Sequence, residues 1–240
     1  MKSLTFLIIC LSILISLCPL NSAANSASTS LWGKKLEFKG PPCLWQLHPE
    51  VSIPALTDLS ICIRLKRTSS AQWTGFLYRS TKRKELGLEG SNSHLKIWLF
   101  GKQYEVHQEL SLKKWHSICL TWSGKNERLK LYVNGPTVEN LLFYSDGAQQ
   151  LAQNGTLTLG VSHSVLPNGE LKPESGNSLL GEIGLFRMWG KEWSTEEVSS
   201  LGCADGDVVS WDLRQWKNDC PPVPDNNLTC GKYGILFLLT

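Results

Sequence analysis

Three stretches of the chain alternate apolar and polar positions with the period of two that is typical of β-strands. They are residues 115–122, 129–133 and 180–189. The second stretch ends at Asn134-Gly135, a dipeptide that adopts the positive φ angles of a tight hairpin turn. The pattern predicts antiparallel strands joined by short turns, and therefore an all-β sandwich.

The strand at 115–122 carries bulky groups on both of its faces. Trp115 and Cys119 lie on one face, and Ile118 and Trp122 lie on the other, because side chains alternate across a strand. We therefore expect both faces of this strand to be covered. Ten tryptophans occur in the chain, most of them beside strand-like residues, and this favours core packing over an aromatic ligand box.

The ends of the chain differ from its middle. Lys2 precedes an apolar run that ends before Pro19, and small residues follow, which predicts a secretory signal peptide. The run is shorter than the roughly 20 residues of a membrane-spanning helix, so a signal anchor is disfavoured. We predict a signal peptide (1–24), a flexible start (25–31), one domain (32–220), and an exit segment with a short apolar end (221–240).

A single short helix is predicted at residues 194–198. Ser194 is a favoured N-cap residue, and two glutamates follow it in the first turn. The apolar end at residues 233–240 is too short to cross a bilayer, so no membrane span is expected in this chain.

The charge of the chain is nearly balanced. The formal net charge of +3 falls to +2 when Lys2 leaves with the signal peptide, and such a balance does not indicate nucleic-acid binding. The basic stretches, 82–84 and 113–114, could hold a sulphated glycan, but runs this short are more typical of solvated loops. Asn154 and Asn227 each begin a glycosylation sequon, and both are expected in exposed loops.

Cysteine usage indicates an oxidising compartment. Cys10 and Cys18 leave with the signal peptide, and six cysteines, which allow 15 connectivities, remain: Cys43, Cys62, Cys119, Cys203, Cys220 and Cys230. A bond between Cys62 and Cys119 would join two strands and close a loop of about 60 residues, worth about 4 kcal/mol in the chain-entropy model. The cysteines and histidines do not have the spacing of a zinc site. The apolar strand context of Cys62 and Cys119 disfavours redox catalysis.

Motifs between Trp32 and Trp216 resemble the pentraxin-like domains, which are concanavalin-type jelly rolls of two antiparallel sheets with one short helix. The segments that carry the resemblance are 33–38, 61–63, 115–122, 157–160, 181–189 and 208–211. The resemblance implies an all-β jelly-roll sandwich stabilised by disulfides. It also implies that Cys62 and Cys119 are bonded to each other.

The stretch at 115–120 departs from the pentraxin signature, which places His two residues before its Cys, whereas His116 stands three residues before Cys119. This variant is similar to the pentraxin-like domain at the amino terminus of certain adhesion G-protein-coupled receptors. That resemblance extends to the region after the short helix and implies a bond between Cys203 and Cys230. Cys43 and Cys220 then remain as the third pair, which suits a jelly roll whose chain ends run close together.

Classical pentraxins bind two calcium ions, so the resemblance raises the question of a calcium site. Glu174 and Asn177 fall on later ligand positions of the family, and Glu85 could replace an earlier acid. The acidic and amide triplet of the family, however, is replaced by Ser162-His163-Ser164. Because calcium requires six to eight oxygen ligands, we favour the interpretation of Glu85, Glu174 and Asn177 as ordinary polar loop residues.

The jelly roll also houses glycoside hydrolases, which need two carboxylates flanking one sugar bond. The hydrolase pattern Glu-x-Asp-x-x-Glu is absent, and Glu182 is predicted to share its face of the strand only with Gly184 and Phe186. His163 has no partners in the pattern of a catalytic triad and is expected to be a loop residue. The sequence therefore disfavours catalysis.

These observations predict a secreted or cell-surface, non-catalytic binding or adhesion module. The resemblance implies a fragment or short form of an adhesion receptor ectodomain, without a cofactor and with an extracellular protein or glycan as its partner. The alternative is a free soluble pentraxin that recognises glycan or phosphate groups through calcium. A jelly-roll glycoside hydrolase is a distant third hypothesis.

Overall fold

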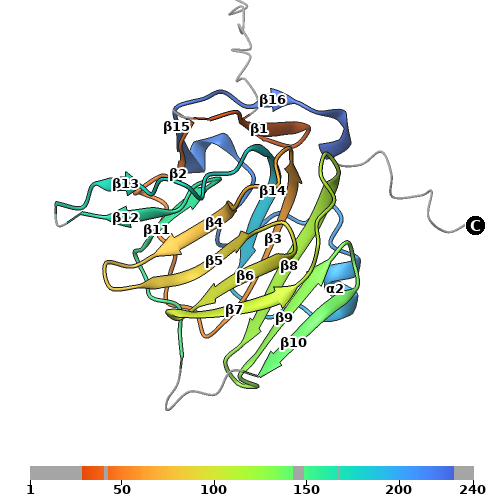
Figure 1. Ribbon diagram of the computed structural model, residues 1–240. Coiled ribbons are helices and arrows are strands. Elements are labelled where there is room, and N and C mark those ends of the chain that lie inside the picture. Colours follow the sequence, from red (N-terminus) through yellow and green to blue (C-terminus); the bar gives the residue numbers. More distant parts are fainter. Residues whose placement is uncertain (1–28, 41–42, 143–148, 167, 230–240) are drawn as a thin grey trace, which may run out of the picture.

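A computed structural model describes residues 29–40, 43–142, 149–166 and 168–229. It contains two seven-stranded antiparallel sheets packed face to face (Figure 1). The first sheet runs in the order β10 (Thr137–Leu142), β9 (Arg128–Val133), β8 (Trp115–Ser123), β3 (Asp58–Arg67), β14 (Gly181–Trp189), β1 (Lys34–Phe38) and β16 (Val223–Pro224). The second runs in the order β15 (Trp216–Asn218), β2 (Trp45–Leu47), β11 (Thr156–Leu159), β4 (Trp73–Arg79), β5 (Lys84–Gly90), β6 (His94–Leu99) and β7 (Lys102–His107).

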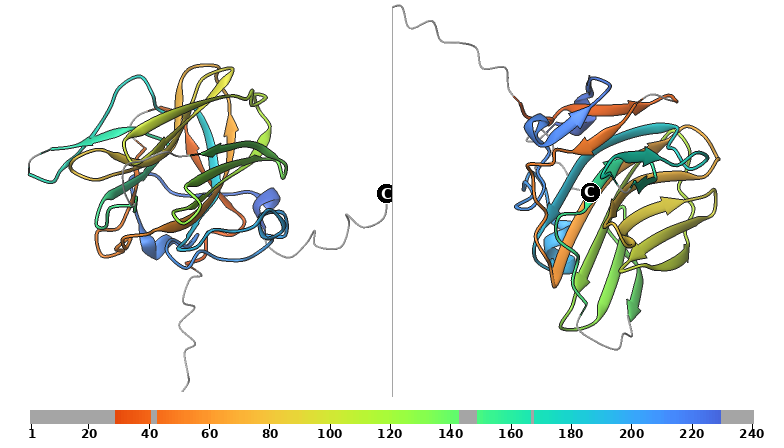
Figure 2. Two further views of the ribbon diagram at one scale, coloured as in Figure 1. Left: turned by 90° about the horizontal axis from the view of Figure 1, so that it is seen from below. Right: turned by 90° about the vertical axis from the view of Figure 1, so that its left-hand side faces the viewer.

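The predicted all-β jelly roll is thus confirmed, with few elements outside the two sheets. β12 (His163–Val165) and β13 (Leu171–Pro173) pair as a separate ribbon. The helix α2 (Thr195–Ser199) lies outside the first sheet, on the side away from the second sheet (Figure 2). Two short 3-10 turns, η1 (Leu213–Gln215) and η2 (Asn226–Leu228), are the remaining elements of the described residues.

The core fills the space between the sheets and is rich in aromatic rings. Phe186 packs edge-on against Phe76 of the second sheet at 5.4 Å between ring centroids, and against Trp216 at 5.7 Å. Seven of the ten tryptophans are buried, and Trp32, Trp98 and Trp115 are half-buried. The interpretation of the tryptophans as mainly core residues is confirmed.

The predicted hairpin joins β9 to β10. Asn134 and Gly135 have φ angles of 56° and 104°, the left-handed conformations that favour this dipeptide at a turn. β8 lies between β3 and β9, and its inner face contributes Ile118 and Trp122 to the core. Cys119 on its outer face is also buried, so the expectation of two covered faces holds in the middle of the strand.

The strand β14 contains a bulge that the sequence pattern does not indicate. Its register against β3 shifts between Gly184 and Arg187, and Leu185 has a φ of 50°. Ile183 and Phe186 are therefore both in the core although they are three residues apart. The expectation that Phe186 shares a face with Glu182 is wrong, because one extra residue reverses the alternation.

Residues just outside the predicted domain bounds of 32 and 220 also pack against the domain. The Leu31 amide donates to the Trp211 carbonyl at 2.9 Å, and the Leu31 side chain is fully buried. After residue 220, β16 pairs with β1, and Leu228 is fully buried. Residues 223–228 therefore pack against the first sheet through one backbone edge and one apolar side chain. The predicted domain boundaries stay a prediction.

The predicted signal peptide and the apolar end lie outside the described residues. Within the described part of the chain, no helix has the length and apolar character that crossing a membrane requires.

One disulfide joins two strands of the first sheet, and another joins residues near the two ends of the described chain. Cys62 and Cys119 are direct partners on β3 and β8, and they are bonded with their Cα atoms 4.2 Å apart. A second bond joins Cys43 to Cys220, 177 residues away in sequence. Cys203 is also in a disulfide, and Cys230, the partner that the resemblance implies, lies outside the described residues.

Candidate functional site

The three residues considered for calcium have different partners in the structure. The Glu85 side chain is buried, and its Oε1 accepts hydrogen bonds from Ser80 Oγ (2.9 Å) and Arg83 Nε (3.0 Å). Glu174 instead accepts from Ser162 Oγ at 2.7 Å. Asn177 lies with Trp73 beside a cavity of about 30 Å³ that contains neither of those glutamates. Among the residues that the structure describes, no group of three or more His, Cys, Asp or Glu could hold a metal ion.

Glu89 on β5, which lies beside the same cavity as Asn177, is already paired with a lysine. Lys84 Nζ lies 2.8 Å from Glu89 Oε1 and 4.5 Å from the centroid of the Trp98 ring. The other Glu89 oxygen accepts a hydrogen bond from Trp98 Nε1 at 2.9 Å. A calcium ion would need these oxygens together with several more, so the donor set does not fit the ion.

His163 is a buried structural residue. The hydroxyl of Thr158 donates to the Val161 carbonyl at 2.9 Å, so it accepts from His163 Nδ1 at 2.8 Å. His163 Nε2 has no partner among the described residues, and the side chain has no exposed surface. Burial lowers the pKa of His163 to about 4, and the charge of Arg79 adds to this effect. The imidazole is therefore neutral at pH 7.

The sheet brings together two carboxylates that the strand pattern separates. Glu37 on β1 is the direct cross-strand neighbour of Glu182 on β14. Lys35 Nζ lies 3.1 Å from Glu37 and 3.0 Å from Glu182, Lys39 pairs with Glu37 at 2.6 Å, and Lys66 pairs with Glu182. Both acids border a cavity of about 340 Å³.

Glu37 lacks the raised pKa of a glycosidase acid. Hydrogen bonds from Lys39 and Lys35 hold the pKa of Glu37 below its ordinary value. A general acid at neutral pH needs a raised pKa, so that it still holds a proton to give. The two glutamates are therefore members of an ion-pair network with three lysines.

Most of the cations in the basic stretch at 82–84 form ion pairs within the chain. Arg83 is paired with Glu85, and Lys84 with Glu89, so two of its three cations have intramolecular partners. The two sequon residues, Asn154 and Asn227, are both exposed. Their glycosylation stays a prediction.

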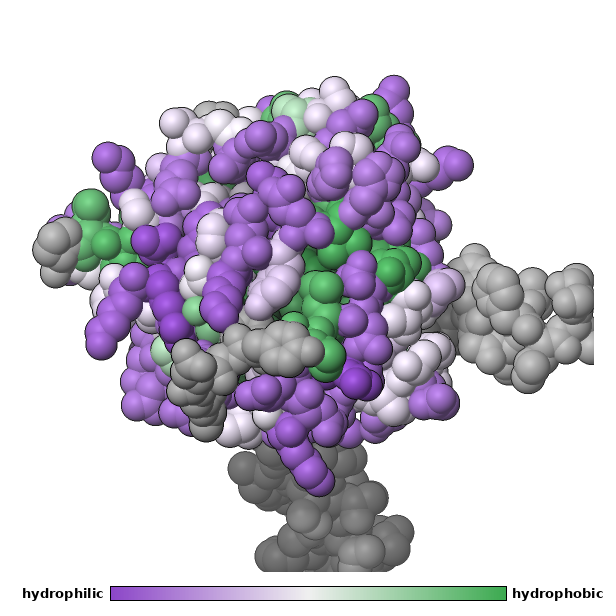
Figure 3. Space-filling view, turned by 60° about the horizontal axis from the view of Figure 1, so that its bottom comes forward, coloured by the Kyte–Doolittle hydropathy of each residue, from purple (hydrophilic) through white to green (hydrophobic). Residues whose placement is uncertain are grey.

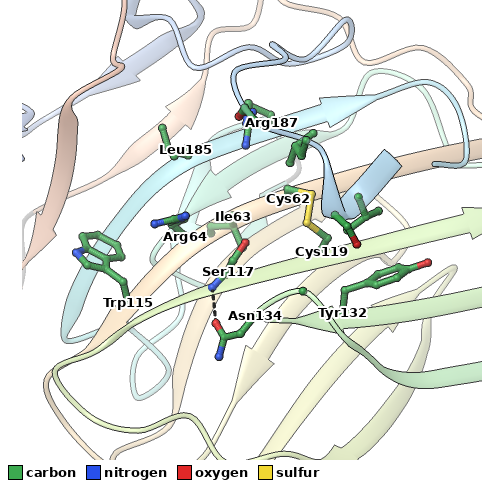
Figure 4. A pocket seen from close by; sticks show the side chains of 15 residues that line it. Cys62, Ile63, Arg64, Trp115, Ser117, Cys119, Tyr132, Asn134, Leu185 and Arg187 are labelled. Carbon is green, nitrogen blue, oxygen red and sulfur yellow. Dashed lines mark hydrogen bonds between the residues drawn. A yellow bond between two sulfur atoms is a disulfide. The ribbon is translucent and has the colours of Figure 1, made fainter. Parts of the chain in front are cut away.

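A groove of about 530 Å³ lies on the outer face of the first sheet, beside α2 (Figure 4). The strands β3, β8 and β14, the turn after β9, and α2 with the loop that follows it all contribute to its walls. Its lining combines arginine, aromatic and aliphatic side chains, and none of its fifteen described lining residues is acidic.

A disulfide forms the floor of the groove. The Cys62–Cys119 disulfide lies there and packs with Tyr132, Trp193 and Val198 beneath α2. A capping box holds the start of α2, because the Ser194 side chain accepts from the Glu197 amide while the Glu197 side chain accepts from the Ser194 amide. The predicted N-cap is confirmed.

Arg187 is a buried cation in the groove wall. Its side chain is 4% exposed, and Nη1 donates to the carbonyls of Gly202 (3.3 Å) and Ala204 (2.5 Å). The guanidinium lies 5.1 Å from the ring of Trp32 and 5.5 Å from that of Trp189. Burial lowers the pKa of Arg187 to about 10, so the group stays charged at pH 7. The negative charge of Asp205 partly offsets this lowering, but no described carboxylate lies within 4.0 Å of the guanidinium.

Arg64 is the second cation of the groove. It lies on β3, two residues from Cys62 and on the same outer face, and it is half-buried. No described carboxylate lies within 4.0 Å of its guanidinium. In Figure 4 its side chain lies between those of Trp115 and Leu185.

Sequence reasoning missed this groove. Arg64 follows Cys62 by two residues, and this spacing in a strand places a cation on the same face as the half-cystine. No such signal exists for Arg187, because its face depends on the bulge at Leu185.

The surface also has an apolar area. Figure 3 shows apolar residues gathered within a largely polar surface on the side of the molecule that it presents. Leu142 at the end of β10 is 47% exposed, and Val138 and Leu141 of the same strand pack partly against the core. The groove beside α2 is the better candidate for recognition because it combines a hollow with unpaired charge.

Comparisons with known proteins agree with the fold. Residues 45–199 match the family model Laminin_G_3, described as the concanavalin A-like lectin/glucanases superfamily. The human adhesion G-protein coupled receptor G4 is 30% identical over 214 residues, which cover 85% of this chain and 7% of that protein. The chain therefore spans a small part of the length of this relative.

Two solved structures share the architecture. A native heptameric SAP-like pentraxin from Limulus polyphemus superposes with a TM-score of 0.69 at 20% identity, over 84% of this chain and 99% of the other. The full extracellular region of zebrafish Gpr126/Adgrg6 gives a TM-score of 0.69 at 21% identity, over 84% of this chain and 28% of the other. At these identities the likeness concerns the fold alone.

Proposed function

The chain belongs to the concanavalin A-like lectin/glucanases superfamily, and from this premise we propose that it is an extracellular, non-catalytic recognition module of the adhesion-receptor type. Its recognition surface is the groove beside α2. The module is either secreted or held at the cell surface as part, or as a short form, of a receptor ectodomain.

One observation carries the choice of surface. Arg64 and Arg187 line one hollow, and none of its described lining residues is acidic. Pockets that bind ligands combine apolar walls with a few converging polar groups, and this groove has both.

The extracellular setting has separate support. The disulfides Cys43–Cys220 and Cys62–Cys119 suit an oxidising compartment. Similarity to a receptor covers 85% of this chain, and a fold of the same kind occurs in an extracellular region. The remaining 93% of the receptor relative is not matched, so the activity of the whole receptor is not transferred to this chain.

The two rival functions have less support. Recognition through calcium is disfavoured because Glu85 and Glu89 are occupied by Arg83 and Lys84. Glycoside hydrolysis is disfavoured because the neighbouring carboxylates Glu37 and Glu182 are both neutralised by lysines.

The test is cell binding by the full chain. We would express it in mammalian cells with an Fc domain at the carboxyl end and measure binding of the secreted fusion to a panel of cell lines by flow cytometry. We expect saturable binding to at least one line, unchanged in EDTA, and no binding of Fc alone. Retention of the fusion inside the producing cells, or the absence of saturable binding to every line, would contradict the proposal.

A further inference from the structure

We propose that the groove beside α2 binds an acidic side chain in an extended segment of a partner protein, with the carboxylate against the guanidinium of Arg64. Apolar side chains that flank the acid lie on the walls formed by Val198 and Leu201. This inference rests on the function proposed above and gives that groove a ligand chemistry.

The two arginines of the groove favour an anionic ligand. Arg64 and Arg187 have no described carboxylate at ion-pair distance, and none of the described lining residues is acidic. A cation removed from water is stabilised when an anion pairs with it. Arginine presents a planar fork of N–H donors that matches a carboxylate with two parallel hydrogen bonds.

The two arginines have different roles. Nη1 of Arg187 is occupied by the carbonyls of Gly202 and Ala204, so this residue positions the loop after α2 and adds positive potential. Arg64 is half-buried, and its guanidinium has no described ion pair. Arg64 is therefore the residue that contacts the ligand.

A protein segment fits the lining better than a sugar or a phosphate. The polar side chains of the groove are largely used within the molecule: Asn134 Oδ1 accepts from the Ser117 amide at 3.0 Å, and Ser199 Oγ donates to the Thr195 carbonyl at 2.8 Å. Few groups remain to bind the many hydroxyls of a glycan. Leu185, Val198 and Leu201 offer apolar walls, which suit the side chains that flank an acid in a peptide.

The groove is built before any ligand arrives. Its floor is a disulfide between paired strands, and its helix is capped at the start. The register shift in β14 places Arg187 on the outer face, with Leu185 in a left-handed conformation that is unfavourable for a non-glycine residue. A preorganised site loses less conformational entropy on binding.

The probe is a pair of eight-residue fluorescent peptides with alternating residues, one of Glu and Leu and one of Gln and Leu. Binding to the full chain is measured by fluorescence polarisation at 50 and 300 mM NaCl. We expect the Glu peptide to bind at least tenfold more tightly than the Gln peptide, and the difference to shrink at high salt, because exposed charges are screened.

Three variants locate the effect. Arg64→Ala is expected to weaken binding of the Glu peptide at least tenfold, and Arg64→Lys to weaken it less, because a lysine keeps the charge but not the fork. Arg128→Ala is the matched control, since Arg128 is an exposed arginine of β9 in the same sheet and does not line the groove. The control should bind within twofold of the native chain.

Several results would overturn the proposal. They are equal binding of the two peptides, an equal effect of Arg64→Ala and Arg128→Ala, or Arg64-dependent binding of a heparin octasaccharide or inorganic phosphate without binding of the Glu peptide.

The Fc fusion separates this failure from failure of the proposed function. If cells bind the native fusion and its Arg64→Ala variant equally, the carboxylate inference is wrong and the recognition module stands. If no cell line binds the native fusion, the proposed function itself is wrong.

Discussion

At the scale of the residue, burial decides the protonation of His163. The ring is enclosed with one hydrogen bond to Thr158, and its second nitrogen has no described acceptor. A proton added at Nε2 would create a buried N–H donor and a charge near Arg79, and both are unfavourable. The neutral imidazole is therefore part of the folded state.

We expect acid to destabilise the domain through His163. The unfolded chain takes up this proton near the ordinary pKa of 6.5, whereas the folded chain takes it up only at about 4. The unfolded state therefore holds more protons between these values, and the free energy of unfolding falls as the pH falls through this window. The contribution is complete above pH 6.5, and the shift sets an upper limit of about 3 kcal/mol for its loss.

The measurement is urea unfolding, followed by tryptophan fluorescence, from pH 7.5 to pH 4. His163→Gln should show a flatter dependence on pH than the native chain, while the control His107→Gln, which replaces an exposed histidine, should keep the native slope. A native slope in His163→Gln would show that other groups cause the effect.

At the scale of the element, neighbouring strands and the helix above them form one unit. Cys62 on β3 and Cys119 on β8 are direct cross-strand partners, and α2 lies over their sulfur atoms with Val198 buried. The hydroxyls of Tyr132 on β9 and Thr195 on α2 are 3.3 Å apart, which ties a third strand to the helix.

Removing this disulfide should lower stability by about 4 kcal/mol, because the bond closes a loop spanning a separation of 57 residues in the unfolded chain. The change is the double variant Cys62→Ala with Cys119→Ala, and the measurement is the urea midpoint with its slope. Ser194→Ala is a milder reference for the same unit, since loss of the helix cap costs about 1 kcal/mol. A loss below that of the reference would contradict a major role for the bond.

At the scale of the whole molecule, the fold is held by two packed layers, by a disulfide on the outer face of the first sheet, and by a disulfide that joins distant parts of the chain. Cys43 and Cys220 join distant parts of the chain, and β16 adds the last described strand to the first sheet beside β1. The carboxylates on the second sheet are paired with cations of the chain itself. Glu85 and Glu89 therefore need no calcium ion to balance their charge.

Calcium should therefore leave the melting temperature unchanged. We expect the full chain to melt within about 1 °C of the same temperature in millimolar calcium and in EDTA, because only an ion that binds the folded state can stabilise it. Magnesium at equal ionic strength is the control. A rise specific to calcium would revive calcium-dependent recognition, and Glu174→Gln would then show whether Glu174 contributes.

Local features of the chain account for what the sequence alone determined. Alternation with a period of two predicts β8 and β9, the Asn134-Gly135 dipeptide predicts the hairpin, and Ser194 predicts the start of α2. Each depends on neighbouring residues only, through side-chain alternation, positive φ angles or a cap. The strand positions of Cys62 and Cys119, with the family resemblance, also indicate the pair that is bonded in the structure.

Only the tertiary structure decided the arrangement of groups that are distant in sequence. It made Glu37 and Glu182 direct neighbours, and it placed residues 223–228 against the first sheet. It also put the bulge at Leu185, which directs Arg187 to the groove that Arg64 lines. Strand order and bulges depend on how the sheets pack as a whole, so no local pattern specifies them, and the candidate site is a product of that packing.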